Sequence, residues 1–98
     1  MSRALSLLLG ALLSSLLVAL PAVATDGKAV FDQSCAGCHA VMAPKFGDKA
    51  AWAPFVKQGA AALTATVVKG KGAMPPKGGA ASEADVKAAI EYVISQMQ

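Results

Sequence analysis

The clearest pattern of apolar and polar positions lies near the C-terminus. Four apolar residues recur there at i, i+4, i+7 and i+11, the spacing of one helix face: Val86, Ile90, Val93 and Met97. Just before them, residues 82–85 read Ser-Glu-Ala-Asp, which has the form of a capping box. The pattern therefore predicts a helix that begins after Ser82 and buries this face.

A second helix is expected to begin just after residue 26. Thr25 or Asp26 can serve as its N-cap, because a side-chain oxygen there accepts a hydrogen bond from an amide of the first turn. The helix is expected to run through residues 27–33 and to reach the first cysteine, Cys35.

Two helices are expected in the middle of the chain. Asp48 can cap a helix that begins at the next residue, in which Pro54 disturbs the hydrogen bonding. A further helix fits residues 60–69 and stops at Gly70. Residues 70–81 contain four glycines and two prolines and are expected to form a loop. No segment shows the alternation of a strand, so the predicted fold class is all-α.

The N-terminal residues form a separate compositional block. Residues 4–24 contain 16 apolar residues in 21 positions, after a single positive charge at Arg3. A proline and a small-x-small sequence end the block, which is the form of a secretory signal peptide cleaved after Ala24. An uncleaved membrane anchor is the alternative, because the uncharged stretch is long enough to span a bilayer. We therefore expect a signal peptide at 1–24 and one domain at 25–98, outside the cytoplasm and without stable membrane insertion after cleavage.

Residues 25–98 offer few large apolar side chains for a core. They contain 37 apolar residues, of which 17 are alanine, so only 20 carry a larger apolar or cysteine side chain. Ordering a residue costs roughly 1.5 kcal/mol, so a domain of this size usually depends on disulfides, a metal or a cofactor. The length also excludes a large multidomain enzyme and a repeat array.

The charge of the chain is mildly positive. Nine Lys or Arg stand against six Asp or Glu, and removal of Arg3 with the leader leaves eight against six, a balance of +2. A nucleic-acid-binding domain would show a denser basic stripe with aromatic residues between the charges, whereas this chain has five aromatic residues. We therefore expect no nucleic acid among its partners.

The chemistry of the chain is concentrated in one string of five residues. Cys35 and Cys38 are the only cysteines, and His39, the only histidine, follows directly, which gives Cys-Ala-Gly-Cys-His. Cys-x-x-Cys-His is the attachment signature of c-type haem. Two thiols three positions apart can each form a thioether with one vinyl group, and the adjacent imidazole can reach the iron. We therefore predict one covalently bound haem c, with its iron held by His39.

Three other chemistries could use a Cys-x-x-Cys pair. A structural zinc site usually has four protein ligands, whereas this chain offers one pair of cysteines and one histidine. A dithiol oxidoreductase normally places the pair in a βαβ setting, which this sequence does not show. A plain disulfide between Cys35 and Cys38 is the simplest alternative, but it accounts neither for the adjacent histidine nor for the small core.

The second axial position of the iron has several candidates. A second histidine is absent, which leaves the lysines and three methionines: Met42, Met74 and Met97. Met42 is three residues from His39 and would have to cross to the other face of the ring, and Met97 belongs to the apolar face of the last helix. Met74 lies in the Gly- and Pro-rich loop, directly before two prolines, and is the expected ligand. His/Met ligation raises the reduction potential and closes the iron to small molecules, which indicates one-electron transfer.

Several motifs around these residues resemble class I cytochrome c, and within it the short bacterial cytochrome c5-like group. They are Gly27 and Phe31 in the first helix, APKFGDKAAWAP at 43–54, AMPPKGG at 73–79 and AAIEY at 88–92. The resemblance implies a small all-α class I cytochrome c fold, with four to five short helices around one covalently bound haem in residues 25–98. It also implies that the first and last helices cross near Gly27, Phe31 and Tyr92.

The resemblance assigns roles to individual residues. It implies that the backbone carbonyl of Pro44 accepts the Nδ1 proton of His39, a bond that orients the ligand. It also implies that Met74 supplies the axial sulfur and that Trp52 lies near the haem propionates. The sequence departs from the group at Phe55, where a basic residue that could pair with a propionate is common.

The resemblance and the leader together indicate a periplasmic electron carrier and not an enzyme. Its expected partners are respiratory redox proteins: a cytochrome reductase or dehydrogenase as donor, and a terminal oxidase or reductase as acceptor. Three lysines bracket Met74 with no acid between them and would form a positive rim that attracts an acidic partner: Lys69, Lys71 and Lys77. A gas-binding haem sensor, a haem peroxidase and a cytochrome subunit of a larger dehydrogenase are the alternatives.

Overall fold

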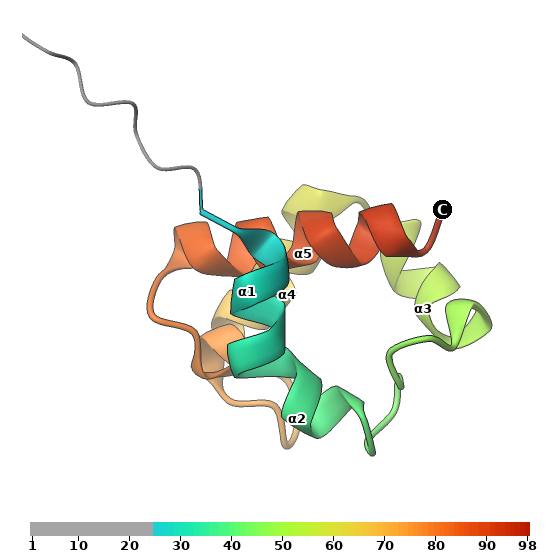
Figure 1. The fold of residues 1–98 in the computed structure, drawn as a ribbon, viewed down its shortest axis with the longest axis horizontal. Helices are drawn as coiled ribbons and strands as arrows, with labels where there is room; N and C mark the ends of the chain where they lie inside the picture. The colour runs from blue at the N-terminus through green and yellow to red at the C-terminus, as the bar shows by residue number, and fades with distance from the viewer. Residues whose placement is uncertain (1–24) are drawn as a thin grey trace, which may run out of the picture.

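The computed structural model describes residues 25–98, which form a helical domain with no strand among them (Figure 1). The expected signal peptide at 1–24 lies outside the described residues. The elements of the described part are α1 (Gly27–Val30), η1 (Phe31–Cys35), α2 (Ala36–His39), α3 (Lys49–Val56), α4 (Ala60–Lys69), η2 (Pro76–Gly79) and α5 (Glu83–Gln96). The all-α prediction is confirmed. In this part of the chain, no helix has the length and apolar character needed to cross a membrane.

The first three elements form one continuous helical run over residues 27–39. Asp26 caps the run, because its carboxylate accepts hydrogen bonds from two amides of the first turn, at 3.0 and 3.3 Å. The run continues past Cys35, where the prediction ended, because the π-helical turn η1 passes into α2 with right-handed helical backbone angles at Cys35 and Ala36. Both cysteines and His39 therefore lie on one helical run.

Both middle helices begin where the sequence predicted, and α4 also ends at the predicted position. At the start of α3, the carboxylate of Asp48 accepts a hydrogen bond from the amide of Ala51 (3.1 Å), and Pro54 lies inside this helix near its end. Helix α4 ends at Gly70, whose φ of 80° is a conformation that glycine adopts without strain. The predicted loop follows, and it contains only the short 3-10 turn η2.

The last helix supplies much of the core. Ser82 caps α5 by accepting a hydrogen bond from the amide of Asp85 (3.1 Å). Met97, predicted on the buried face, lies at the C-cap, where it is half-buried and packs against the core. Two buried clusters result: Phe31, Trp52, Ala89 and Val93 form one, and Leu63, Val86 and Ile90 form the other.

Helices α1 and α5 cross at close range (Figure 1). A Cβ atom on Gly27 would lie 2.1 Å from the carbonyl oxygen of Ala88, so only glycine lets the two backbones approach this far. The rings of Phe31 and Tyr92 also meet here, with centroids 5.7 Å apart. The crossing that the resemblance implied is therefore confirmed.

Candidate haem site

The described part of the chain contains an apolar cavity of about 390 Å³, a volume in the range of small-molecule and cofactor pockets. Its walls come from η1, α2, α3, α4, α5 and the loop after α4. A second cavity of about 220 Å³ shares five wall residues with it: Cys35, His39, Ala43, Lys71 and Met74. The two cavities are therefore two parts of one crevice.

The two cysteines differ in their surroundings. Cys35 is half-buried and lines both cavities, whereas Cys38 is exposed and lines the smaller one. Burial, and then the neighbouring Cys38, raise the pKa of the Cys35 thiol above its ordinary value. In the polypeptide alone this thiol therefore stays protonated at neutral pH, and neither cysteine is engaged in a disulfide.

His39 is oriented by a backbone carbonyl. Its Nδ1 lies 2.9 Å from the carbonyl oxygen of Pro44. A carbonyl oxygen only accepts, so Nδ1 carries the proton in this hydrogen bond and Nε2 keeps a lone pair that can bind a metal. The returning loop is fixed at the same place, because the amide of Phe46 donates to the carbonyl oxygen of His39 (2.9 Å). The contact implied for Pro44 is thus present.

The three candidate methionines occupy different places. Met74 is half-buried and lines both cavities, whereas Met42 lines the smaller one and is 47% exposed. Met97 packs against the core and belongs to neither wall. Met74 is held by a tight turn, in which its amide and carbonyl each hydrogen bond to the backbone of Lys71 at 3.0 Å. Of the three, Met74 is the one that shares both parts of the crevice with His39.

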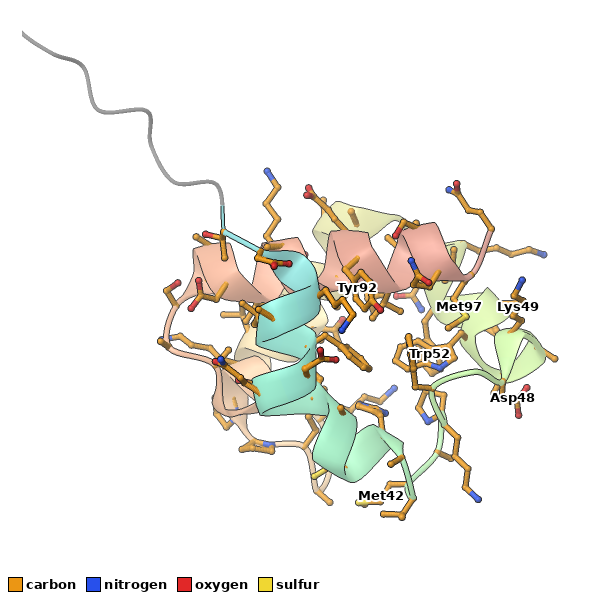
Figure 2. All side chains as sticks on the ribbon, in the orientation of Figure 1. Met42, Asp48, Lys49, Trp52, Tyr92 and Met97 are labelled. Atoms are coloured by element: carbon orange, nitrogen blue, oxygen red, sulfur yellow. The ribbon has the colours of Figure 1, made fainter. Side chains whose placement is uncertain are left out.

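Trp52 is buried and forms part of the wall of the larger cavity; Figure 2 shows it pointing from α3 toward the interior. Its ring lies against that of His39, with centroids 5.2 Å apart. Its indole N–H donates to the carbonyl oxygen of Lys45 (2.9 Å). The ring therefore supports the imidazole, while the indole proton is used by the backbone.

Sequence reasoning did not identify two wall residues, Phe55 and Lys71. Phe55 lines the larger cavity, and the Nζ atom of Lys71 lies 5.8 Å from the centroid of its ring. Lys71, expected on a positive rim around Met74, is exposed and also lines both cavities. The signal that could have located it is the pair Gly72-Ala73, because a two-residue turn sets the residues on either side of it next to one another.

The residues of the crevice fit a haem group. The walls are predominantly apolar, as a flat macrocycle requires, and they carry two thiols for covalent attachment. They also carry an imidazole with a metal-binding nitrogen and a thioether sulfur, which is the axial pair found in cytochromes c. This donor set can hold a haem covalently and can fill both axial positions of its iron.

Comparison with known proteins shows relatives of this chain. The family model described as cytochrome C oxidase, cbb3-type, subunit III matches residues 22–93. Cytochrome c-555 of Chlorobaculum tepidum is 48% identical over 82 residues, which cover 74% of this chain and 76% of that protein. Cytochrome c-555 of Chlorobaculum thiosulfatiphilum is 45% identical over 82 residues, which cover 74% of this chain and 95% of that protein.

A solved structure shows the same fold. A chain in the crystal structure of the electron transfer complex of nitrite reductase with cytochrome c is 52% identical, with a TM-score of 0.70. The match covers 74% of this chain and 95% of that chain. This chain therefore belongs to the cytochrome c family, among the small class I cytochromes c, which are electron carriers with one covalently attached haem c and not enzymes.

Proposed function

We propose that the chain is a periplasmic one-electron carrier whose low-spin haem is ligated by His39 and Met74 and attached through Cys35 and Cys38. The bound group supplies the redox chemistry, because its iron accepts and releases one electron. The polypeptide supplies the axial ligands, the apolar surroundings and the surface at which partners dock.

One observation carries this proposal: His39 and Met74 both line the two parts of the crevice, although 35 residues separate them in the chain. The Pro44 carbonyl holds the proton on Nδ1, which makes Nε2 the more basic ligand atom. A thioether sulfur as second ligand raises the reduction potential and leaves no open position on the iron. Both effects suit electron transfer.

The same residues argue against a gas sensor and a peroxidase. Both functions need an open or easily opened axial position, which Met74 would fill. Peroxidase chemistry also needs a distal acid–base group. Residues 25–98 contain no arginine and no histidine other than His39, which already serves as a ligand in this proposal.

The test is the visible spectrum of the haem-loaded protein, oxidised and reduced, compared with that of Met74→Ala. We expect a low-spin spectrum whose oxidised form shows the weak long-wavelength band of iron–sulfur ligation, and we expect Met74→Ala to abolish that band. Met42→Ala is the matched control, because Met42 also lines the smaller cavity, and it should leave the band unchanged. A high-spin wild-type spectrum, or a band that survives in Met74→Ala, would overturn the ligation.

Respiratory redox proteins are the proposed partners, with a reductase or dehydrogenase as donor and a terminal oxidase or reductase as acceptor. The solved relative in complex with nitrite reductase supports a reductase as acceptor. A cytochrome subunit of a larger dehydrogenase is the alternative to a free carrier, and co-purification with such an enzyme would support it. The positive rim of Lys69, Lys71 and Lys77 around Met74 supplies charge for docking. Association that does not depend on ionic strength would refute this role of the rim.

The periplasmic location rests on the apolar leader and the sequence at its end. It is tested by the mass of the protein in a periplasmic extract. A mature N-terminus at Thr25 supports cleavage, whereas full-length protein in the membrane fraction would indicate a retained anchor.

A further inference from the structure

The walls of the crevice contain a single side chain with a fixed charge. Among all residues that line the two cavities, Lys71 is the one Lys, Arg, Asp or Glu, and it lines both. A haem carries two carboxylates, the propionates, on an otherwise apolar ring. A haem that enters this crevice thus meets one cation and no fixed anion on its walls.

The Lys71 ammonium lies near an aromatic ring. Its Nζ lies 5.8 Å from the centroid of the Phe55 ring, within cation–π range. The rings of Phe55 and Trp52 are themselves neighbours, with centroids 6.4 Å apart. The charge therefore sits at the part of the crevice that these two rings enclose.

This part of the crevice lies away from Cys38. Phe55 and Trp52 line the larger cavity and not the smaller one, Cys38 lines the smaller and not the larger, and Cys35 and Lys71 line both. The vinyl groups that react with cysteines and the propionates are on opposite halves of the haem ring. A haem attached at Cys35 and Cys38 would therefore direct its carboxylates away from Cys38, toward the part of the crevice that Phe55 lines.

The backbone of Lys71 is tied to the proposed iron ligand. The amide of Lys71 donates to the carbonyl of Met74, and the amide of Met74 donates to the carbonyl of Lys71. These bonds use main-chain atoms, so a change of side chain at Lys71 leaves them in place. The charge of the side chain can therefore be tested separately from the turn that presents Met74.

We infer that Lys71 is a positioning residue that pairs with a haem propionate. Through its turn with Met74, this pair ties the loop that carries the axial ligand to the far edge of the haem. The inference rests on the proposed function, since it takes Met74 as the ligand. A positive charge beside the haem favours the reduced state, so the pair also raises the reduction potential.

The experiment measures the reduction potential of the haem-loaded protein as wild type, Lys71→Gln, Lys71→Arg and Lys69→Gln. Lys69 and Lys71 are both exposed, but Lys69, on the last turn of α4, lines neither cavity, so it is the matched control for loss of one positive charge. We expect Lys71→Gln to lower the potential more than Lys69→Gln does. Lys71→Arg keeps the positive charge and should therefore have a potential near that of the wild type. In high salt, at about 1 M, where the screening length is about 3 Å, the Lys69 effect should vanish and the Lys71 effect should persist.

A second readout is the propionate-bending band in the resonance Raman spectrum, which a merely structural lysine would not move. It should shift in Lys71→Gln and not in Lys69→Gln. Equal potentials for the two variants, an effect at Lys71 that salt removes, or an unshifted band would each overturn the inference. An absent iron–sulfur band in the wild type would instead refute the proposed ligation, and this spectrum is recorded first.

Discussion

At the scale of single residues, Gly70 determines how close the Met74 loop comes to the end of α4. Its φ is 80°, and a Cβ atom there would lie 2.8 Å from the carbonyl oxygen of Met74 and from the nitrogen of Pro76. Both neighbours are backbone atoms, which cannot rotate away as a flexible side chain can. The loop is thus packed directly onto a position where a side chain has no room.

Gly70→Ala should therefore displace the loop that carries Met74. We expect the free energy of unfolding to fall by about 1–3 kcal/mol, because backbone strain and overlap add. We also expect the iron–sulfur band of the oxidised protein to weaken, measured by visible absorption alongside urea unfolding. Gly72→Ala is the control, since Gly72 also has a positive φ (58°) but open space around it. The free energy of unfolding of Gly72→Ala should fall by about 1 kcal/mol, and its iron–sulfur band should remain. Equal spectra for the two variants would show that Gly70 does not control the position of the Met74 loop.

At the scale of elements, the sequence predicted the helix starts well, because each start depends on residues only a few positions apart. Asp26, Asp48 and Ser82 each act as the N-cap that the sequence indicated, because a cap and the amide it binds are two or three positions apart. The Cys-x-x-Cys-His string likewise predicts the attachment residues without any knowledge of the fold, and both cysteines line the crevice. Local chemistry of this kind can be read directly from the chain.

What the sequence could not predict depends on contacts between distant segments. The helical run continues past Cys35 to His39, and no residue between them signals whether the helix ends or continues. The place of Lys71 in the wall of the crevice brings it near the ring of Phe55, 16 residues earlier in the chain. The departure at Phe55 was visible in the sequence, but its spatial relation to Lys71 was not.

The crossing of α1 and α5 gives an element-scale prediction at Gly27. Alanine is the better helix former, so propensity alone would make Gly27→Ala stabilising by up to about 1 kcal/mol. The overlap with the Ala88 carbonyl should reverse this sign and give a net loss of about 1–3 kcal/mol in unfolding free energy. Thermal unfolding measures it, with Lys28→Ala as an exposed neighbouring control within about 0.5 kcal/mol of the wild type. A higher melting temperature in Gly27→Ala would show that the two helices can separate at little cost.

At the scale of the whole molecule, the core surrounds the crevice. Seven apolar residues are buried in the described part of the chain, and six of them also line the larger cavity: Phe31, Trp52, Leu63, Ala89, Ile90 and Val93. Their side chains therefore face the space that the haem would fill. Without the haem, these residues lack many of the contacts that a packed interior provides.

Loss of haem attachment should consequently unfold the domain. In Cys35→Ala/Cys38→Ala produced without haem, we expect little helical signal in far-ultraviolet circular dichroism, compared with the haem-loaded wild type in the same buffer. A small core leaves too little burial to offset the entropy of ordering the chain. Native-like helix content in this variant would show that the polypeptide folds without the group.

Trp52 gives the molecule an internal optical reporter. It is the only tryptophan, it lies in the wall of the larger cavity, and its ring is next to that of His39. Indole emission overlaps haem absorption, so energy transfer to a haem bound in this cavity would quench the Trp52 fluorescence. Unfolding separates the two chromophores and restores the emission. The brightness of a single native side chain therefore records the unfolding and refolding of the protein in real time, without any added label.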